Sequence, residues 1–207
     1  MSTIAPISLT APRLSTGTCT ITSVVRAHGH SVEQTQYATS TYVATEIGRA
    51  TLLFIRGLND RFIVDRVKRQ LIRSRSDGQR RQLEQIRSLI GAVEMIRDER
   101  PSLVDGYECR SIRVQNEDAQ LILSIETYCT RVEGLEETSL HAEREFDSDR
   151  QPFSLPLRAN EVVVRSTTRA LAASFGQSQT IHLLDVSDRI ADPRRITEML
   201  DYPIVDR

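Results

Sequence analysis

The sequence predicts an α+β fold in which β-hairpins pack with a central antiparallel αα-hairpin, preceded by an extended N-terminal arm. Residues 17–45 and 107–132 alternate polar and apolar side chains with the period of two that is typical of strands. Residues 46–100 instead repeat apolar side chains at spacings of three and four, which is typical of helices. Because strands and helices come in blocks rather than in strict alternation, α+β is favoured over a doubly wound sheet.

The first residues are predicted to form an arm outside a single domain. Residues 1–16 are rich in Ser and Thr, contain Pro6 and Pro12, and have too few large apolar side chains to fold alone. A chain of 207 residues is within the usual size of one domain. We therefore expect one α+β domain over residues 17–207, made of a β-hairpin at 17–45, an αα-hairpin at 46–100 and a mixed α/β segment at 107–207.

The first hairpin is predicted around the turn signal His28–Ser31. Its return strand is expected over Tyr37–Val43. Residues 1–45 contain only three charged side chains, beside sixteen Ser and Thr residues. Because few charges protect the edges of this hairpin, we expect it to pair within the sheet or with another copy of the chain.

Two helices are predicted between the hairpins. The first covers residues 46–75 and carries an apolar stripe at helical spacing: Ile47, Thr51, Phe54, Ile55, Leu58 and Phe62. A turn at 74–78 separates it from a second helix over 79–99, which Pro101 ends. The short connection predicts an antiparallel αα-hairpin.

The second half of the chain is predicted to mix strands and helices. A hairpin is expected with one strand over Tyr107–Gln115, a turn at Asn116–Asp118 and a return strand through Leu121, Leu123 and Ile125. Glu161–Val164 fits either a strand or the start of a helix. The remaining predictions are a short helix over Glu136–Phe146, a helix from Ala170 to Phe175 capped by Gly176, a strand over Thr180–Val186, and a last helix to Leu200 with Asp192 as its N-cap and Pro193 at its first position.

Composition indicates an intracellular protein without a disulfide framework. Cys19, Cys109 and Cys129 are an odd number of widely spaced cysteines, which argues against paired disulfides and against a zinc site. The N-terminus lacks the pattern of a signal peptide, and there is no run of 18 apolar residues. We expect a cytoplasmic location, or the host-cell interior or virion if the protein is viral, and no contact with a membrane.

The charged residues are unevenly distributed. Residues 56–81 contain nine basic and three acidic side chains, whereas residues 82–150 contain sixteen acidic and eight basic ones. Three interpretations remain open: a solvated face with internal ion pairs such as Asp65 with Arg69, contact between oppositely charged surfaces of two copies, or contact with the nucleic-acid backbone. The candidate contact residues are Arg66, Arg69, Arg73, Arg75, Arg80 and Arg81.

No catalytic, metal or cofactor signature is found in the sequence. The nucleophile-elbow, Walker and G-x-G-x-x-G patterns are absent. His28 and His30 are interpreted as turn residues, and His182 as a structural histidine within a strand. The carboxylates between Glu136 and Asp149 do not have calcium-loop spacing, so they are interpreted as a solvated acidic segment. We therefore expect no catalytic residue, no metal and no cofactor.

The leading hypothesis is a non-enzymatic, self-assembling structural protein of the viral-coat or phage-structural type. Subunits would touch through the N-terminal arm and through complementary basic and acidic surfaces, which predicts a homo-oligomer. One alternative is a sequence-nonspecific nucleic-acid-binding regulator that uses the Arg-rich helical hairpin. The other is an enzyme whose site is assembled from residues scattered along the chain.

Overall fold

The computed structural model describes residues 13–14, 17–73, 77–116, 120–148, 153–172, 175–190 and 192–206. Within these ranges the chain forms one sheet of twelve strands, with three α-helices and one 3-10 turn. In chain order the elements are β1 (Cys19–Ala27), β2 (His30–Ala38), β3 (Tyr42–Ile47), β4 (Ala50–Ile55), β5 (Asp60–Asp65), β6 (Gln70–Arg73), α1 (Asp77–Ile90), β7 (Glu94–Val104), β8 (Tyr107–Gln115), β9 (Ile122–Arg131), η1 (Leu135–Glu137), α2 (Leu140–Ser148), β10 (Glu161–Ala172), β11 (Phe175–Ser187), α3 (Pro193–Leu200) and β12 (Ile204–Val205).

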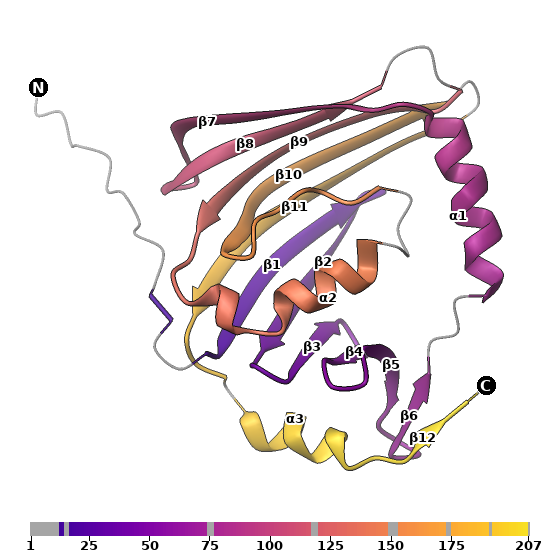
Figure 1. The fold of residues 1–207 in the computed structure, drawn as a ribbon, viewed down its shortest axis with the longest axis vertical. Helices are drawn as coiled ribbons and strands as arrows, with labels where there is room; N and C mark the ends of the chain where they lie inside the picture. The colour runs from indigo at the N-terminus through magenta and orange to yellow at the C-terminus, as the bar shows by residue number, and fades with distance from the viewer. Residues whose placement is uncertain are drawn as a thin grey trace, which may run out of the picture.

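Most neighbouring strands of the sheet are consecutive in the sequence. The order across the sheet is β12-β6-β5-β4-β3-β2-β1-β11-β10-β9-β8-β7. Among the described strands every pair is antiparallel except β12 with β6. The pairing of β1 with β11 joins two meanders into one strongly curved sheet, whose concave face holds α2 (Figure 1).

The two faces of the sheet carry separate hydrophobic clusters. Val43 and Phe54 face α2, in a cluster that includes Leu140 and Phe146. Because neighbouring residues of a strand point to opposite faces, Tyr42 and Leu53 turn the other way, and α3 covers that side with Ile196 and Met199. A third cluster packs Ile86 and Ile90 of α1 against Ile112, Val114, Leu123 and Ile125 of the sheet.

The predicted αα-hairpin is wrong, and with it the predicted fold class. Residues 46–73 form the end of β3 and the three short strands β4, β5 and β6 instead of a helix. Tight turns interrupt this stretch, and Gly48, Asn59 and Arg69 adopt positive φ angles that an α-helix excludes. Asp65 fixes one turn by accepting hydrogen bonds from the backbone of Lys68 (2.9 Å) and Val67 (3.1 Å).

Both predicted β-hairpins are confirmed. β1 and β2 pair along their whole length around His28 and Gly29, whose positive φ angles of 52° and 76° match a type I′ turn. The return strand is β2 (His30–Ala38), so the predicted bounds Tyr37–Val43 are wrong: they cover only the end of β2, the connection at 39–41 and the start of β3. The second hairpin pairs β8, which has the predicted bounds Tyr107–Gln115, with β9. Of its predicted turn, residues 117–118 are outside the described ranges.

Of the other predicted strands and helices, some are confirmed and some are wrong. The strand over Thr180–Val186 lies within β11, and α3 begins as predicted, with Asp192 accepting a hydrogen bond from the backbone of Arg195 and Pro193 in the first turn. The helix from Ala170 to Phe175 is wrong, because Ala170–Ala172 end β10 and Phe175 begins β11, while residues 173–174 are outside the described ranges. The helix over 79–99 corresponds to α1 only up to Ile90, where Gly91 (φ 66°) ends it.

Pro101 lies inside a strand rather than at the end of a helix. β7 is the edge strand of the sheet, and its pairing with β8 is interrupted between Asp98 and Ser102. A proline is tolerated there because an irregular edge does not need its missing N–H. Glu161–Val164, which fitted either a strand or the start of a helix, is the start of β10. The predicted helix over Glu136–Phe146 overlaps the end of η1 and most of α2.

Most of the predicted arm, residues 1–12 and 15–16, is outside the described ranges. Arg13 and Leu14 are described, and Leu14 is buried in the cluster under α2. Its backbone N–H donates to Glu133 O at 2.9 Å. None of the helices in the described part of the chain is long and apolar enough to cross a membrane.

Candidate ligand-binding cavity

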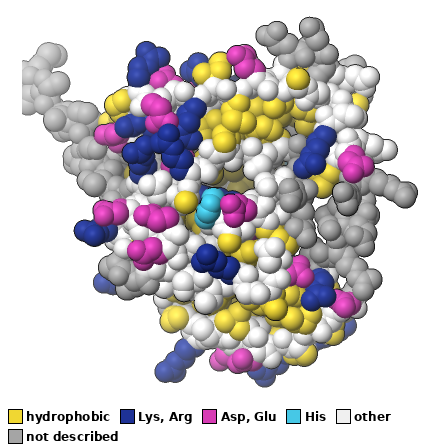
Figure 2. All heavy atoms as spheres, in the orientation of Figure 1, with side chains coloured by type: hydrophobic (Ala, Val, Ile, Leu, Met, Phe, Trp, Pro, Cys, Tyr) yellow, Lys and Arg dark blue, Asp and Glu magenta, His cyan; other side chains and the backbone are white. Residues whose placement is uncertain are grey.

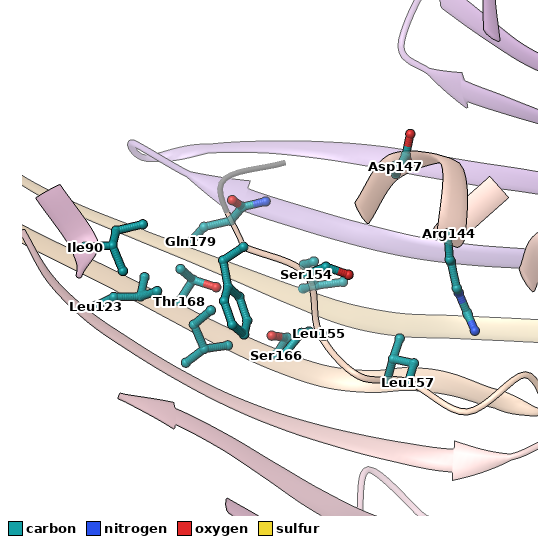
Figure 3. A pocket seen from close by; sticks show the side chains of 13 residues that line it. Ile90, Leu123, Arg144, Asp147, Ser154, Leu155, Leu157, Ser166, Thr168 and Gln179 are labelled. Carbon is teal, nitrogen blue, oxygen red and sulfur yellow. The ribbon is translucent and has the colours of Figure 1, made fainter. Parts of the chain in front are cut away.

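A cavity of about 470 Å³ opens on the concave face of the sheet, between β9–β11 and the segment that follows α2. Figure 2 shows this face, where apolar side chains gather over the upper strands, and Figure 3 shows the cavity from close by. The lining residues are Ile90, Leu123, Ile125, Arg144, Asp147, Phe153, Ser154, Leu155, Leu157, Ser166, Thr168, Gln179 and Ile181. Apolar side chains therefore form most of the wall.

The floor of the cavity follows from strand register. Thr168 of β10 lies opposite Ile125 of β9 and opposite Gln179 of β11, so the three side chains share one face. Ser166 lies opposite Ile181 in the same way, and its hydroxyl is 2.8 Å from that of Thr127. The space exists because β10 places the short side chains of Ser166 and Thr168 here, each beside a larger aliphatic side chain, Ile181 or Ile125, of a neighbouring strand.

The segment 153–157 forms the roof. Phe153, Leu155 and Leu157 are partly buried and pack against the cluster that contains Ile125. The chain turns at Pro156, where Leu157 N donates a hydrogen bond of 2.8 Å to Leu155 O, and Phe153, Ser154, Leu155 and Leu157 all line the cavity. The roof is thus one irregular segment of the chain rather than a packed layer of secondary structure.

Helix α2 supplies the charged wall. Its buried face is made of Leu140, Glu143 and Phe146, which are three residues apart, and the ring of Phe146 lies 5.3 Å from that of Phe54 on β4. Arg144 and Asp147, also three apart, lie on the neighbouring face and line the cavity. The amphipathic spacing of this one helix therefore decides which charges meet the core and which meet the cavity.

Glu143 and Asp147 share one cation from the sheet. Arg61 of β5 donates through Nη2 to Glu143 Oε1 at 2.7 Å and to Asp147 Oδ2 at 2.6 Å, and its guanidinium carbon lies 6.0 Å from the ring centre of Phe146. Glu143 is only 4% exposed. Burial raises the pKa of this carboxyl to about 7, more than the charge of Arg61 lowers it.

Arg144 has no such partner. It forms no ion pair with any described carboxylate, and its described hydrogen bond is a long one of 3.5 Å from Nη1 to Arg158 O. The carboxylates whose charge reaches it, Glu143 and Glu161, are paired with Arg61 and Arg97 respectively. Burial is the main cause of the lowered pKa of the Arg144 guanidinium.

The predicted contact residues lie away from the cavity. Arg66 pairs with Glu46 and donates to Thr51 Oγ1 at 2.8 Å. Arg73 pairs with Asp60 (2.8 Å) and Asp206 (3.3 Å), and the Arg69 guanidinium lies over the ring of Tyr202. Arg75 is outside the described residues, as are the side chains of Arg80 and Arg81 on α1. That these arginines also contact a partner stays a prediction.

Sequence reasoning missed the charged wall. The segment around Glu143 was expected to be solvated, yet Glu143 is buried and Asp147 is ion-paired. The signal was present in the spacing Leu140, Glu143, Phe146, which places a carboxylate on an apolar helix face. His182 lies off the cavity, with Nδ1 3.9 Å from Asp105 Oδ2. Among the described residues no group of His, Cys, Asp and Glu is arranged to hold a metal.

Comparison with known proteins gives no family for this chain. No family model matches the sequence, and no curated protein matches it. Among solved structures, PNGF-II is similar over 92% of this chain and 31% of its own, at 11% identity and a TM-score of 0.45. The chain thus spans about a third of the length of that protein.

Two shorter solved chains are similar over most of their length. One is a DUF1329 family protein from Desulfovibrio piger, at 10% identity and a TM-score of 0.34, with coverage of 86% of this chain and 88% of that one. The other is described as an outer membrane lipoprotein-sorting protein domain from Vibrio parahaemolyticus, at 5% identity and a TM-score of 0.33, with coverage of 88% and 92%. Similarity this distant assigns no function to the present chain.

The predicted coat-type, self-assembling function is wrong, as is the nucleic-acid-binding alternative. The Arg-rich helical hairpin of the nucleic-acid alternative is absent, because residues 46–73 form strands. The strands β1 and β2, whose weakly charged edges allowed pairing with another copy, are both paired on each side within the sheet. Arg61 of the basic stretch is also neutralised within the molecule, since it pairs with Glu143 and Asp147 of the acidic stretch.

Proposed function

We propose that this protein binds an elongated apolar molecule, of the hydrocarbon-chain type, in the cavity on the concave face of its sheet. The observation that carries the proposal is the cavity itself, about 470 Å³ in volume and lined mainly by Leu, Ile and Phe side chains. This volume is within the range of about 300–1,000 Å³ that is usual for small-molecule sites. Each methylene group transferred from water to such a wall contributes about 0.8 kcal/mol.

The shape of the cavity favours a long ligand over a compact one. Ile90 and Leu123 lie at one end, and Arg144 and Leu157 lie at the other, with Ser154 and Leu155 between them (Figure 3). A molecule that fills it would lie along β9–β11 under the roof.

The polar groups of the wall favour binding over catalysis. They are the hydroxyls of Ser154, Ser166 and Thr168, the amide of Gln179, the guanidinium of Arg144, which is not a base at neutral pH, and the carboxylate of Asp147, which is held by Arg61. No described lining residue is a free base placed beside a hydroxyl, as an activated nucleophile would need. Such groups can orient a ligand and leave it chemically unchanged.

The test places a bulky side chain on the floor of the cavity. Thr168 points into the cavity and Thr167, its neighbour on β10, points to the opposite face. Binding of the neutral fluorophore N-phenyl-1-naphthylamine, and its displacement by hexadecanol, should be weakened at least tenfold in Thr168→Trp and unchanged in Thr167→Trp. Circular dichroism checks that both variants fold. A wild-type protein that does not bind the fluorophore, or equal losses in the two variants, would refute the proposal.

A further inference from the structure

The cavity combines an apolar body with one cation. Among its described lining residues Arg144 is the single basic side chain, and Asp147, the single acidic one, is already bound by Arg61. The charge that the cavity offers a ligand is therefore one positive charge at the α2 end. The opposite end, around Ile90 and Leu123, is apolar.

The donors of Arg144 are largely unused. A guanidinium has five N–H groups in a planar fork, and within the described part of the chain only Nη1 has an acceptor, Arg158 O at the long distance of 3.5 Å. A charge removed from water is costly unless it is paired and hydrogen-bonded. The carboxylates that could pair with it are taken, since Glu143 binds Arg61 and Glu161 binds Arg97 and the backbone N–H of Arg158.

A free guanidinium at one end of an apolar cavity is complementary to an amphiphile with an anionic end. Arginine binds a carboxylate through two parallel hydrogen bonds, and one guanidinium balances one negative charge. A phosphate monoester carries close to two negative charges at neutral pH, which would call for a second cation. None of the other described lining residues supplies one.

We propose that the ligand is a long-chain fatty acid whose carboxylate is bound by Arg144 and whose hydrocarbon chain extends under Phe153 toward Ile90 and Leu123. This inference rests on the proposed function, because it assigns the polar end of a ligand whose chain fills the same cavity. It makes Arg144 the specificity-determining residue of the site.

The experiment compares ligands that differ only at the polar end. Hexadecanoic acid, hexadecanol and hexadecyl phosphate are titrated at pH 8, by displacement of N-phenyl-1-naphthylamine, into the wild type, Arg144→Gln and Arg158→Gln. The wild type should prefer the acid to the alcohol by about tenfold or more, as is typical of a hydrogen bond to a charged group. Arg144→Gln should lose this preference while its affinity for the alcohol stays within about twofold.

Arg158→Gln is the matched control, because the Arg158 side chain pairs with Glu99 and does not line the cavity; it should keep the preference for the acid. Equal binding of acid and alcohol by the wild type, a preference that survives in Arg144→Gln, or tighter binding of the phosphate would overturn the inference. In the first two cases the proposed function stands, since the alcohol still binds. If neither acid nor alcohol binds the wild type, the proposed function fails as well.

Discussion

Replacement of Glu143 by Gln should change how the stability of this protein depends on pH. The carboxyl lies on the buried face of α2, 2.7 Å from Arg61 Nη2, with Asp147 bound to the same nitrogen. Burial raises its pKa from 4.5 to about 7, and the second carboxylate of Asp147 adds to that rise. Gln keeps the shape and an acceptor oxygen for Arg61 but cannot ionise.

The sign and size of the effect follow from linkage. Between pH 4.5 and 7 the folded state holds the proton of Glu143 while the unfolded state has released it, so the free energy of unfolding falls as the pH rises. The contribution is complete below pH 4.5 and lost above pH 7. A rise of this size corresponds to about 3 kcal/mol, at 1.36 kcal/mol for each pKa unit.

Urea denaturation at pH 5 and pH 8 measures this contribution. The free energy of unfolding of Glu143→Gln relative to the wild type should increase by about 2–3 kcal/mol between the two pH values, because most of the contribution is still present at pH 5. Glu145→Gln is the matched control, since this neighbouring side chain on α2 is 70% exposed and its ion pair is with His141 at 3.4 Å, so its relative stability should change far less than that of Glu143→Gln. A difference between Glu143→Gln and the wild type that does not change with pH would show that Glu143 ionises normally in the folded protein.

Two further predictions concern the backbone. Gly134 has a φ of 85°, and a Cβ added there would lie 2.7 Å from Leu14 O, so Gly134→Ala should lower the free energy of unfolding by about 1–3 kcal/mol in urea denaturation; an unchanged value would mean that the contact between Leu14 and this turn contributes nothing. Asp192 caps α3 through the backbone N–H of Arg195, so Asp192→Ala should cost about 1 kcal/mol while Asp192→Asn costs much less; equal losses in both variants would contradict the capping role.

The strands that could be predicted from the sequence are those whose turns carry an unambiguous signal. His28-Gly29 sits between two alternating stretches, and β1 and β2 pair around it. The helix predicted over residues 46–75 was wrong because the strands there are only four to six residues long. The large apolar side chains of successive short strands therefore recur at spacings that resemble those of a helix. The turn signals at Gly48 and Asn59-Asp60 were the better evidence, since a helix tolerates neither a positive φ nor such frequent interruption.

The cavity was out of reach of sequence reasoning for a different reason. Its floor depends on the register of β9, β10 and β11, which sets Thr168 beside Ile125 and Gln179 although 43 residues separate Ile125 from Thr168 along the chain. Composition shows an excess of arginine but not which arginine lines the cavity. Arg66 and Arg73, predicted as contact residues, have carboxylate partners within the chain, whereas Arg144 was not considered.

Several polar groups on and beside α2 lack the hydrogen-bond or charge partners that buried polar groups usually have. Among the described residues two buried side-chain atoms have no hydrogen-bond partner, Arg61 Nε and Ser139 Oγ; the first belongs to the arginine bound to α2, and the second lies just before its first residue. Glu143 is a buried carboxyl whose ionisation burial opposes, and Arg144 is an arginine without a carboxylate. Each of these features lowers stability.

A helix that served only to cover the sheet would gain from apolar replacements at all of these positions. Polar groups without partners are concentrated at ligand-binding sites, because the ligand supplies the hydrogen bonds and charges that the folded protein alone does not. Arg144 faces the cavity and Glu143 faces the core. This arrangement is expected if α2 positions the charge of Arg144 for a ligand and is held on the sheet by the ion pairs of Glu143 and Asp147 with Arg61. The two measurements are therefore linked: Glu143→Gln should raise the free energy of unfolding at pH 8, and Arg144→Gln should not lower it while removing the preference for an anionic ligand.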